Sequence, residues 1–113
     1  MVSRGDVWLV LSGDNGEPQP CVVLSPPEIH DYLSLVTVAP LSRDGKPAAY
    51  RVPLDTAEVR GVVHLEQIQS VEMRRLTRQA GTVDGKTLAA ALKTLREMFA
   101  DYVCNGVTPP LAP

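Results

Sequence analysis

Residues 17–27 read EPQPCVVLSPP, an apolar run held between prolines at both ends. The central run, residues 21–25, is short and contains β-branched valine, which favours a buried β-strand. The two prolines that follow would stop the strand, because proline cannot donate to a ladder. Gln19 stands between two further prolines at the strand entrance. Since these prolines restrict the backbone, the entrance is a place where a protein can hold a functional side chain.

The whole chain has the size and composition of one globular domain. It has 113 residues, of which 44% are hydrophobic and 21% are charged, enough for one core. A net charge of -2 and few aromatic residues do not mark a nucleic-acid binder or a base-stacking platform. Without an apolar run of about 20 residues or a signal-peptide core, we expect a cytoplasmic protein. Cys21 and Cys104 would then be reduced thiols, and a disulfide between them is the alternative.

Short β-rich runs, separated by glycine and proline, continue on both sides of this stretch. We expect strands at residues 6–11, 21–25, 33–39, 50–54, 61–65 and 67–71. The apolar period then changes to helical spacing at Leu88, Leu92, Leu95, Phe99 and Tyr102. Asp84 would be the N-cap of this helix. The sequence therefore predicts a mainly β (α+β) fold, a small curved antiparallel sheet covered by a C-terminal helix.

Polar groups that could carry chemistry cluster at the predicted strand ends. Ser42 and Arg43 follow one strand directly. His64 and Glu66 are two residues apart, so in a strand they project to the same side and could act as acid and base. They could equally be a surface ion pair. His30 and His64 have no cysteine–histidine cluster near them, and we expect no metal site.

Basic residues are in excess between positions 42 and 86, a segment that contains eight basic and six acidic residues. Arg43, Lys46 and Arg51 lie close together in sequence. They could form a solvated surface or a patch that faces phosphate groups.

Six sequence blocks, in order, resemble the MazF/PemK/Kid family of toxins from type II toxin–antitoxin systems. The blocks are RGDVWLV (4–10), PCVVLSP (20–26), VTVAPLS (36–42), YRVPL (50–54), GVVHLEQIQSV (61–71) and MRRL (73–76). The resemblance implies an SH3-like β-barrel with a C-terminal helix, found as a homodimer. It also implies a metal-independent endoribonuclease that needs no cofactor and cleaves single-stranded RNA at specific sequences. The implied partner is an antitoxin whose C-terminal segment occupies the RNA groove, and any operator DNA would be bound through that antitoxin.

The resemblance assigns a catalytic position to Gln19, where the family usually has arginine. Glutamine can donate hydrogen bonds but brings no positive charge to a developing phosphorane. Ser42 falls on a family threonine and keeps its hydroxyl group. Arg43 follows at once and could supply the missing charge.

The same comparison makes His64 the general acid and Glu66 the general base for attack of the 2′-hydroxyl on the adjacent phosphate. Residues expected to contact RNA are Arg43, Lys46, Arg51, Gln67 and Gln69. The family domain would span residues 1–104, with 105–113 as a flexible tail.

The neutral residue at position 19 leaves three readings open. In the first the enzyme uses a rearranged site, and in the second it cleaves weakly or at a narrow set of sequences. Alternatively, the fold has drifted to protein binding, as in CcdB-type gyrase poisons of the same superfamily or an inactive homologue.

Overall fold

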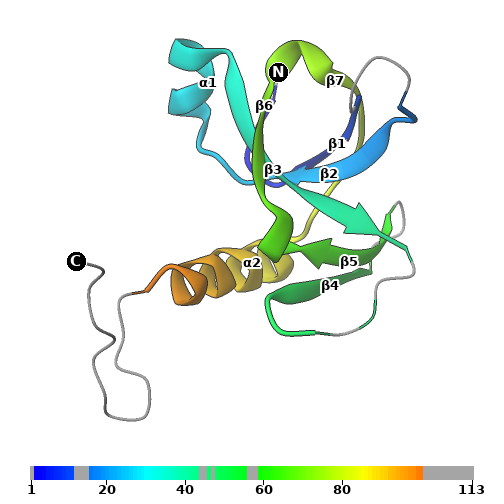
Figure 1. The fold of residues 1–113 in the computed structure, drawn as a ribbon, viewed down its shortest axis with the longest axis vertical. Helices are drawn as coiled ribbons and strands as arrows, with labels where there is room; N and C mark the ends of the chain where they lie inside the picture. Colours follow the sequence, from blue (N-terminus) through cyan, green and yellow to red (C-terminus); the bar gives the residue numbers. More distant parts are fainter. Residues whose placement is uncertain (1, 12–15, 44–45, 47, 56–58, 101–113) are drawn as a thin grey trace, which may run out of the picture.

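The chain folds into a strongly curved antiparallel sheet with a helix packed on one face (Figure 1). The computed structural model describes residues 2–11, 16–43, 46, 48–55 and 59–100. Its strands are β1 (Asp6–Val10), β2 (Gln19–Val23), β3 (Leu35–Ser42), β4 (Arg51–Asp55), β5 (Arg60–His64), β6 (Gln69–Glu72) and β7 (Leu76–Thr82). Its helices are α1 (Pro27–Leu33) and α2 (Gly85–Met98), with the 3₁₀ turns η1 (Leu65–Gln67) and η2 (Met73–Arg75).

The strands follow the order β4-β5-β3-β2-β1-β7, and β6 also pairs with β3. Within the described ranges every ladder is antiparallel, and none joins β7 to β4 or β6. The sheet therefore curves as a barrel does without being closed by hydrogen bonds. The prediction of a mainly β fold with a C-terminal helix is confirmed.

Two hydrophobic cores lie on opposite faces of the central strands. Leu54, Val63 and Leu65 form one core with α2, and Val23 and Val38 belong to a second core inside the curve of the sheet. Because side chains alternate along a strand, β2 and β3 contribute side chains to both cores. This explains why the opening stretch reads as a continuous apolar run rather than an alternating one.

Strand β3 runs through Pro40, although the sequence predicts that the strand ends before it. The Thr37 carbonyl accepts from the Leu24 N–H at 2.9 Å, so the backbone groups of Thr37 face the β2 side of β3. Because backbone groups alternate along a strand, those of Pro40 face the opposite edge of β3, where an N–H is lacking. On that edge, β6 pairs with β3 up to Val38 and β5 pairs from Leu41 onward. Proline sits between two ladders, where it costs no hydrogen bond.

Helix α2 begins as predicted and ends earlier. The Asp84 carboxylate accepts from the Thr87 N–H at 3.2 Å, which confirms the N-cap. The helix ends at Met98, and Phe99 leaves helical geometry (φ -106°, ψ 9°) with 69% of its surface exposed. Its expected place on the buried stripe was therefore wrong. Tyr102, Cys104 and the predicted tail lie outside the described residues.

A short helix, α1, follows β2 where the sequence analysis expects no helix. It begins at Pro27, a residue suited to the first helical position because its ring fixes φ and the missing N–H has no intrahelical partner there. The Ser25 hydroxyl and His30 Nε2 lie 2.8 Å apart and tie this helix to the end of β2. None of the helices in the described ranges is long and apolar enough to span a membrane.

Candidate active site

Strand register places several predicted site residues on the sheet face opposite α2. Leu41 and Val63 point into the core beneath the helix, so the next residues along each strand, Ser42 and His64, project to the other face. Arg51 is the direct partner of His64 in the β4–β5 ladder and shares that face.

Gln69 joins the same face, because it is the partner of Val38, which lies on the same side of β3 as Ser42. Gln19 starts β2 and pairs with Val10 of β1, and the β2–β3 ladder ends at the Cys21–Pro40 pair. The fold thus gathers side chains from β3, β4, β5 and β6 that are far apart in sequence, and the described pairing does not bring Gln19 beside Ser42.

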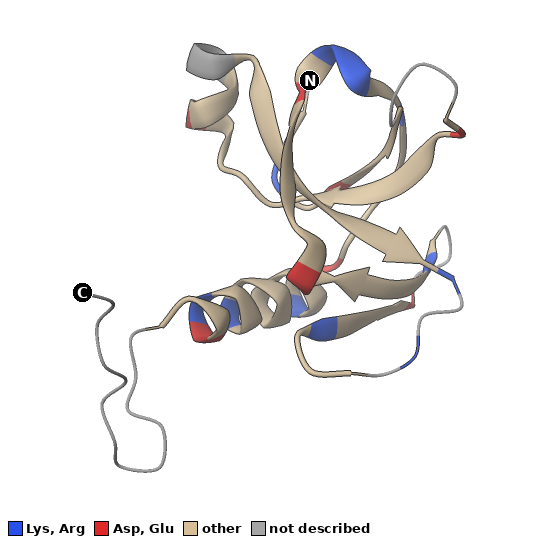
Figure 2. Cartoon of the chain, viewed as in Figure 1, with Lys and Arg blue, Asp and Glu red and all other residues tan. Residues whose placement is uncertain are grey.

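The tightest polar cluster on this face comprises Arg51, His64 and Glu66. Arg51 Nε donates to Glu66 Oε2 at 2.8 Å, and Arg51 Nη1 donates to the Lys46 carbonyl at 3.2 Å. His64 Nδ1 lies 3.8 Å from Glu66 Oε1. In Figure 2 the acidic colour on η1 lies beside the basic colour at the start of β4. The predicted His64–Glu66 neighbours are brought together, and Arg51 is added to them.

Opposing effects act on the Glu66 carboxyl group. Desolvation pushes its pKa up, but the hydrogen bond from Arg51 and the charges of Arg51 and His64 outweigh it, so the pKa lies below its ordinary value. Glu66 is therefore ionised at neutral pH and accepts hydrogen bonds only.

The His64 imidazole is 9% exposed and lies at the end of β5. Within the described residues, neither of its ring nitrogens has a hydrogen-bond partner. Buried polar groups are normally paired, so an unpaired imidazole beside a carboxylate is unusual for a purely structural pair. Both nitrogens are buried, so a bound molecule would reach them only after a local movement of the site.

Ser42 is fixed by close backbone packing of β3 against β5. Gly61 has φ +154°, and a Cβ at this position would lie 2.5 Å from the Ser42 carbonyl oxygen. Only glycine allows this approach. The predicted strand start at Gly61 thus has a second role, because it holds the end of β3.

The other predicted contact residues lie around this cluster rather than in it. Arg43, Lys46 and Gln67 are exposed, and Gln19 is exposed at the start of β2. Because β3 and β5 are antiparallel, Arg43 lies three residues beyond the position opposite His64, roughly 10 Å along the strand. The structure therefore separates Arg43 from the His64–Glu66 cluster.

Tyr50 is a positioning residue that the sequence analysis does not identify. It adopts a left-handed conformation (φ 65°), and its carbonyl accepts from Leu65 N–H at 3.1 Å. This bond ties the entrance of β4 to the start of η1, and so fixes Arg51 relative to Glu66. No local sequence signal marks a tyrosine for positive φ.

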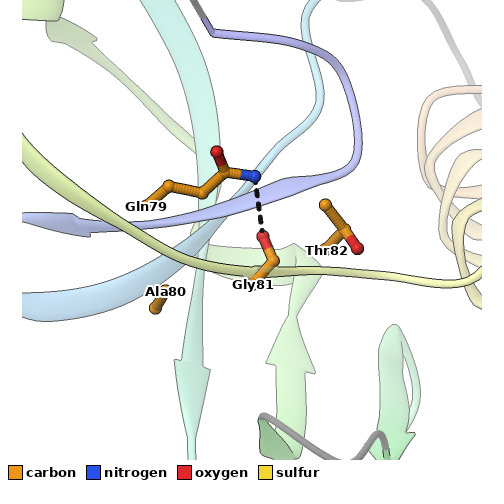
Figure 3. A pocket seen from close by; sticks show the side chains of 4 residues that line it. All are labelled: Gln79, Ala80, Gly81 and Thr82. Atoms are coloured by element: carbon orange, nitrogen blue, oxygen red, sulfur yellow. Dashed lines mark hydrogen bonds between the residues drawn. The ribbon is translucent and has the colours of Figure 1, made fainter.

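A surface hollow lies away from this cluster. It has a volume of about 410 Å³ and is lined by Gln79, Ala80, Gly81 and Thr82 of edge strand β7 (Figure 3). Its polar contact is a hydrogen bond from Gln79 Nε2 to the Gly81 carbonyl at 3.3 Å. It contains no titratable side chain, so we place the chemistry at the His64 cluster. No group of three or more histidine, cysteine, aspartate or glutamate side chains suited to a metal ion occurs among the described residues.

Comparison with known proteins gives a family match over most of the chain. The model of the PemK-like, MazF-like toxins of type II toxin–antitoxin systems matches residues 3–99. The comparison with curated protein sequences returned no match.

Solved structures share the fold. A chain of the MazE–MazF complex (Form-I) from Deinococcus radiodurans has a TM-score of 0.73 and 26% identity, covering 86% of this chain and 94% of that chain. A chain of the Form-II complex from the same organism has a TM-score of 0.76 and 24% identity, covering 88% and 95%. An endoribonuclease in complex with its cognate antitoxin, from a mycobacterial species, has a TM-score of 0.77 and 17% identity, covering 86% and 93%.

Proposed function

Because the chain belongs to the family of PemK-like, MazF-like toxins of type II toxin–antitoxin systems, we propose that it is an endoribonuclease that cleaves single-stranded RNA without a metal ion. The observation that carries the proposal is the cluster of His64, Glu66 and Arg51 on the face opposite α2. Similarity to an endoribonuclease structure supports the same activity. Its RNA substrate places the activity in the cytoplasm.

The proposed reaction uses the RNA's own 2′-hydroxyl as the nucleophile. Glu66, ionised by its contact with Arg51, takes the hydroxyl proton while the oxygen forms a bond to phosphorus. The bond from phosphorus to the 5′-oxygen breaks, and protonated His64 gives that oxygen a proton. The products are a 2′,3′-cyclic phosphate and a 5′-hydroxyl end, so no water or metal enters the bond-breaking step.

Other residues of the face bind and orient the RNA in this proposal. Ser42, on the same face as His64, offers a hydroxyl donor to the RNA, and Gln19, at the start of β2, offers an amide donor. Arg43 and Lys46 attract the phosphate backbone. Gln67 and Gln69 are exposed beside the site and can read base edges.

We further propose an antitoxin partner and a homodimer. The MazE–MazF complexes among the similar structures support a protein partner. A second copy would cover exposed apolar side chains such as Ile29, Leu35 and Phe99, which lie on α1, on β3 and just past the end of α2. Light scattering should give twice the 12.2 kDa chain mass at micromolar concentration, and a stable monomer would contradict the dimer.

The test is cleavage of a long single-stranded RNA by the purified protein in EDTA, followed by mapping of the ends. Cyclic-phosphate ends support the proposal. The neutral, exposed Gln19 favours one alternative, a toxin that acts by binding protein, as a gyrase poison does, or an inactive homologue. Growth arrest in cells without cleavage of any RNA tested would establish the protein-binding alternative.

A further inference from the structure

We propose that Arg51 is a catalytic residue, whose guanidinium group supplies the positive charge for the phosphate being cleaved. This inference rests on the proposed ribonuclease activity and assigns Arg51 a role beyond general RNA binding. Attack of the 2′-oxygen places additional negative charge on the two non-bridging oxygens of the phosphate. In a site without a metal ion, a fixed cationic donor is the group that stabilises such charge best.

The position of Arg51 is fixed by the β4–β5 ladder. It is the direct partner of His64, so the guanidinium and the imidazole stand on the same face of neighbouring strands. Ser42 pairs with Val62, two residues before His64, and therefore lies diagonally across from His64. A phosphate between Ser42 and His64 would lie on the face that Arg51 shares.

Described residues hold the guanidinium group on two sides. Nε donates to Glu66 and Nη1 donates to the Lys46 carbonyl. Within the described residues, no hydrogen bond is assigned to Nη2. The side chain is 24% exposed, so it is partly shielded from water while still reachable by a ligand. The two anchored nitrogens fix the guanidinium plane, so that Nη2, which has no partner among the described residues, is preorganised to donate to an incoming oxygen.

The other cations suit this role less well. Arg43 lies three residues past the position opposite His64, and Lys46 is exposed. Arg60 pairs with Asp55 at the far end of the same ladder, where its side chain is 80% exposed. Gln19, at the start of β2, is neutral.

The experiment compares Arg51→Ala with Arg60→Ala in single-turnover cleavage at saturating protein. Both variants remove an arginine that pairs with a carboxylate in the same ladder, so Arg60→Ala is the matched control. We expect Arg51→Ala to lower the saturated rate about 100-fold or more, and Arg60→Ala to leave it within about threefold. Circular dichroism and thermal melting of both variants check that the fold is kept.

A double-mutant cycle with Glu66→Ala separates direct from indirect action. If Arg51 contacts the phosphate, Arg51→Ala slows the Glu66→Ala protein by a further factor of about 10 or more. If Arg51 acts only by orienting Glu66, it causes no further loss, and the inference is overturned. An increase in KM with an unchanged saturated rate also overturns it, because Arg51 would then only bind RNA. A wild-type protein that cleaves no RNA overturns the proposed function itself, and this inference with it.

Discussion

The two ends of the β4–β5 ladder carry arginine–carboxylate pairs of nearly equal length and different surroundings. Arg51 Nε lies 2.8 Å from Glu66, and Arg60 Nε lies 2.9 Å from Asp55. The Arg60 and Asp55 side chains are 80% and 76% exposed, whereas those of Arg51 and Glu66 are 24% and 30% exposed.

The difference lies in what surrounds each pair. A buried imidazole with no described partner lies beside Glu66, and a second hydrogen bond fixes Arg51. The Arg60–Asp55 pair is at the solvent end of an edge strand. Distance alone would rank the pairs as equal, so the functional assignment rests on burial and on the neighbours that each pair holds.

The largest expected effect comes from removing the acid and the base at the buried end. His64→Ala and Glu66→Ala should each lower the saturated cleavage rate by about 10²–10⁴-fold, the usual contribution of general acid–base catalysis. Asp55→Ala is the control, because it removes a carboxylate from the same ladder at its exposed end. Full activity in both site variants would leave His64 and Glu66 as a surface pair.

Gly61 lies in β5 between the two ion pairs, and a substitution there would disturb the packing of β5 against β3. Gly61→Ala places a Cβ against the Ser42 carbonyl and strains a positive φ, so we expect a loss of about 2 kcal/mol or more in the free energy of unfolding. Urea unfolding measures this loss. The control is Gly85→Ala, where a Cβ would meet no atom within 4 Å, and it should change stability little. Equal stability of the two variants would show that β5 can move away from β3 without cost.

The contrast between β2 and β7 shows how much of the fold follows from the sequence. Strands with continuous or alternating apolar residues were predicted, and Cys21, Val22 and Val23 are all buried as expected. Strand β7 was missed because its sequence, LTRQAGT, has no regular alternation. Its pairing with β1 contains two register shifts, so no period of two could be preserved.

The site was predictable only in part, for a related reason. Alternation along one strand predicts that His64 and Glu66 are neighbours, but β5 ends at His64 and Glu66 lies in η1, where the turn still brings it 3.8 Å from the imidazole. The approach of Arg51 depends on the β4–β5 register. Arg43, adjacent in sequence to Ser42, was the expected source of charge, and the antiparallel register carries it away from His64. Contacts that depend on pairing between strands cannot be predicted from the spacing of residues within one segment.

A smaller effect tests whether charge can be supplied from another strand. In the Arg51→Ala protein, Gln19→Arg should raise the saturated cleavage rate by about 10-fold, because it supplies a cation at the exposed start of β2. In the wild-type protein the same substitution should raise the rate less, since Arg51 already provides the charge. Single-turnover rates of the four proteins measure both effects. A larger gain in the wild type than in the Arg51→Ala protein would mean that position 19, rather than Arg51, limits the reaction.

The smallest expected effect is on stability as a function of pH, and it separates the two ion pairs without RNA. Arg51 lowers the pKa of Glu66 below its ordinary value of 4.5, so the pair stabilises the folded protein above that pH and loses this contribution as the pH falls through the lower folded value. Both side chains are partly exposed, which limits the contribution to about 1 kcal/mol or less. Arg51→Ala should therefore destabilise the protein measurably at pH 7 and progressively less as the pH falls through the folded pKa of Glu66, as followed by urea unfolding. Arg60→Ala removes the exposed pair and is the matched control, and it should change stability less at pH 7. Identical pH profiles for the two variants would remove the distinction between the ends of the ladder, and the two pairs would then be equivalent surface contacts.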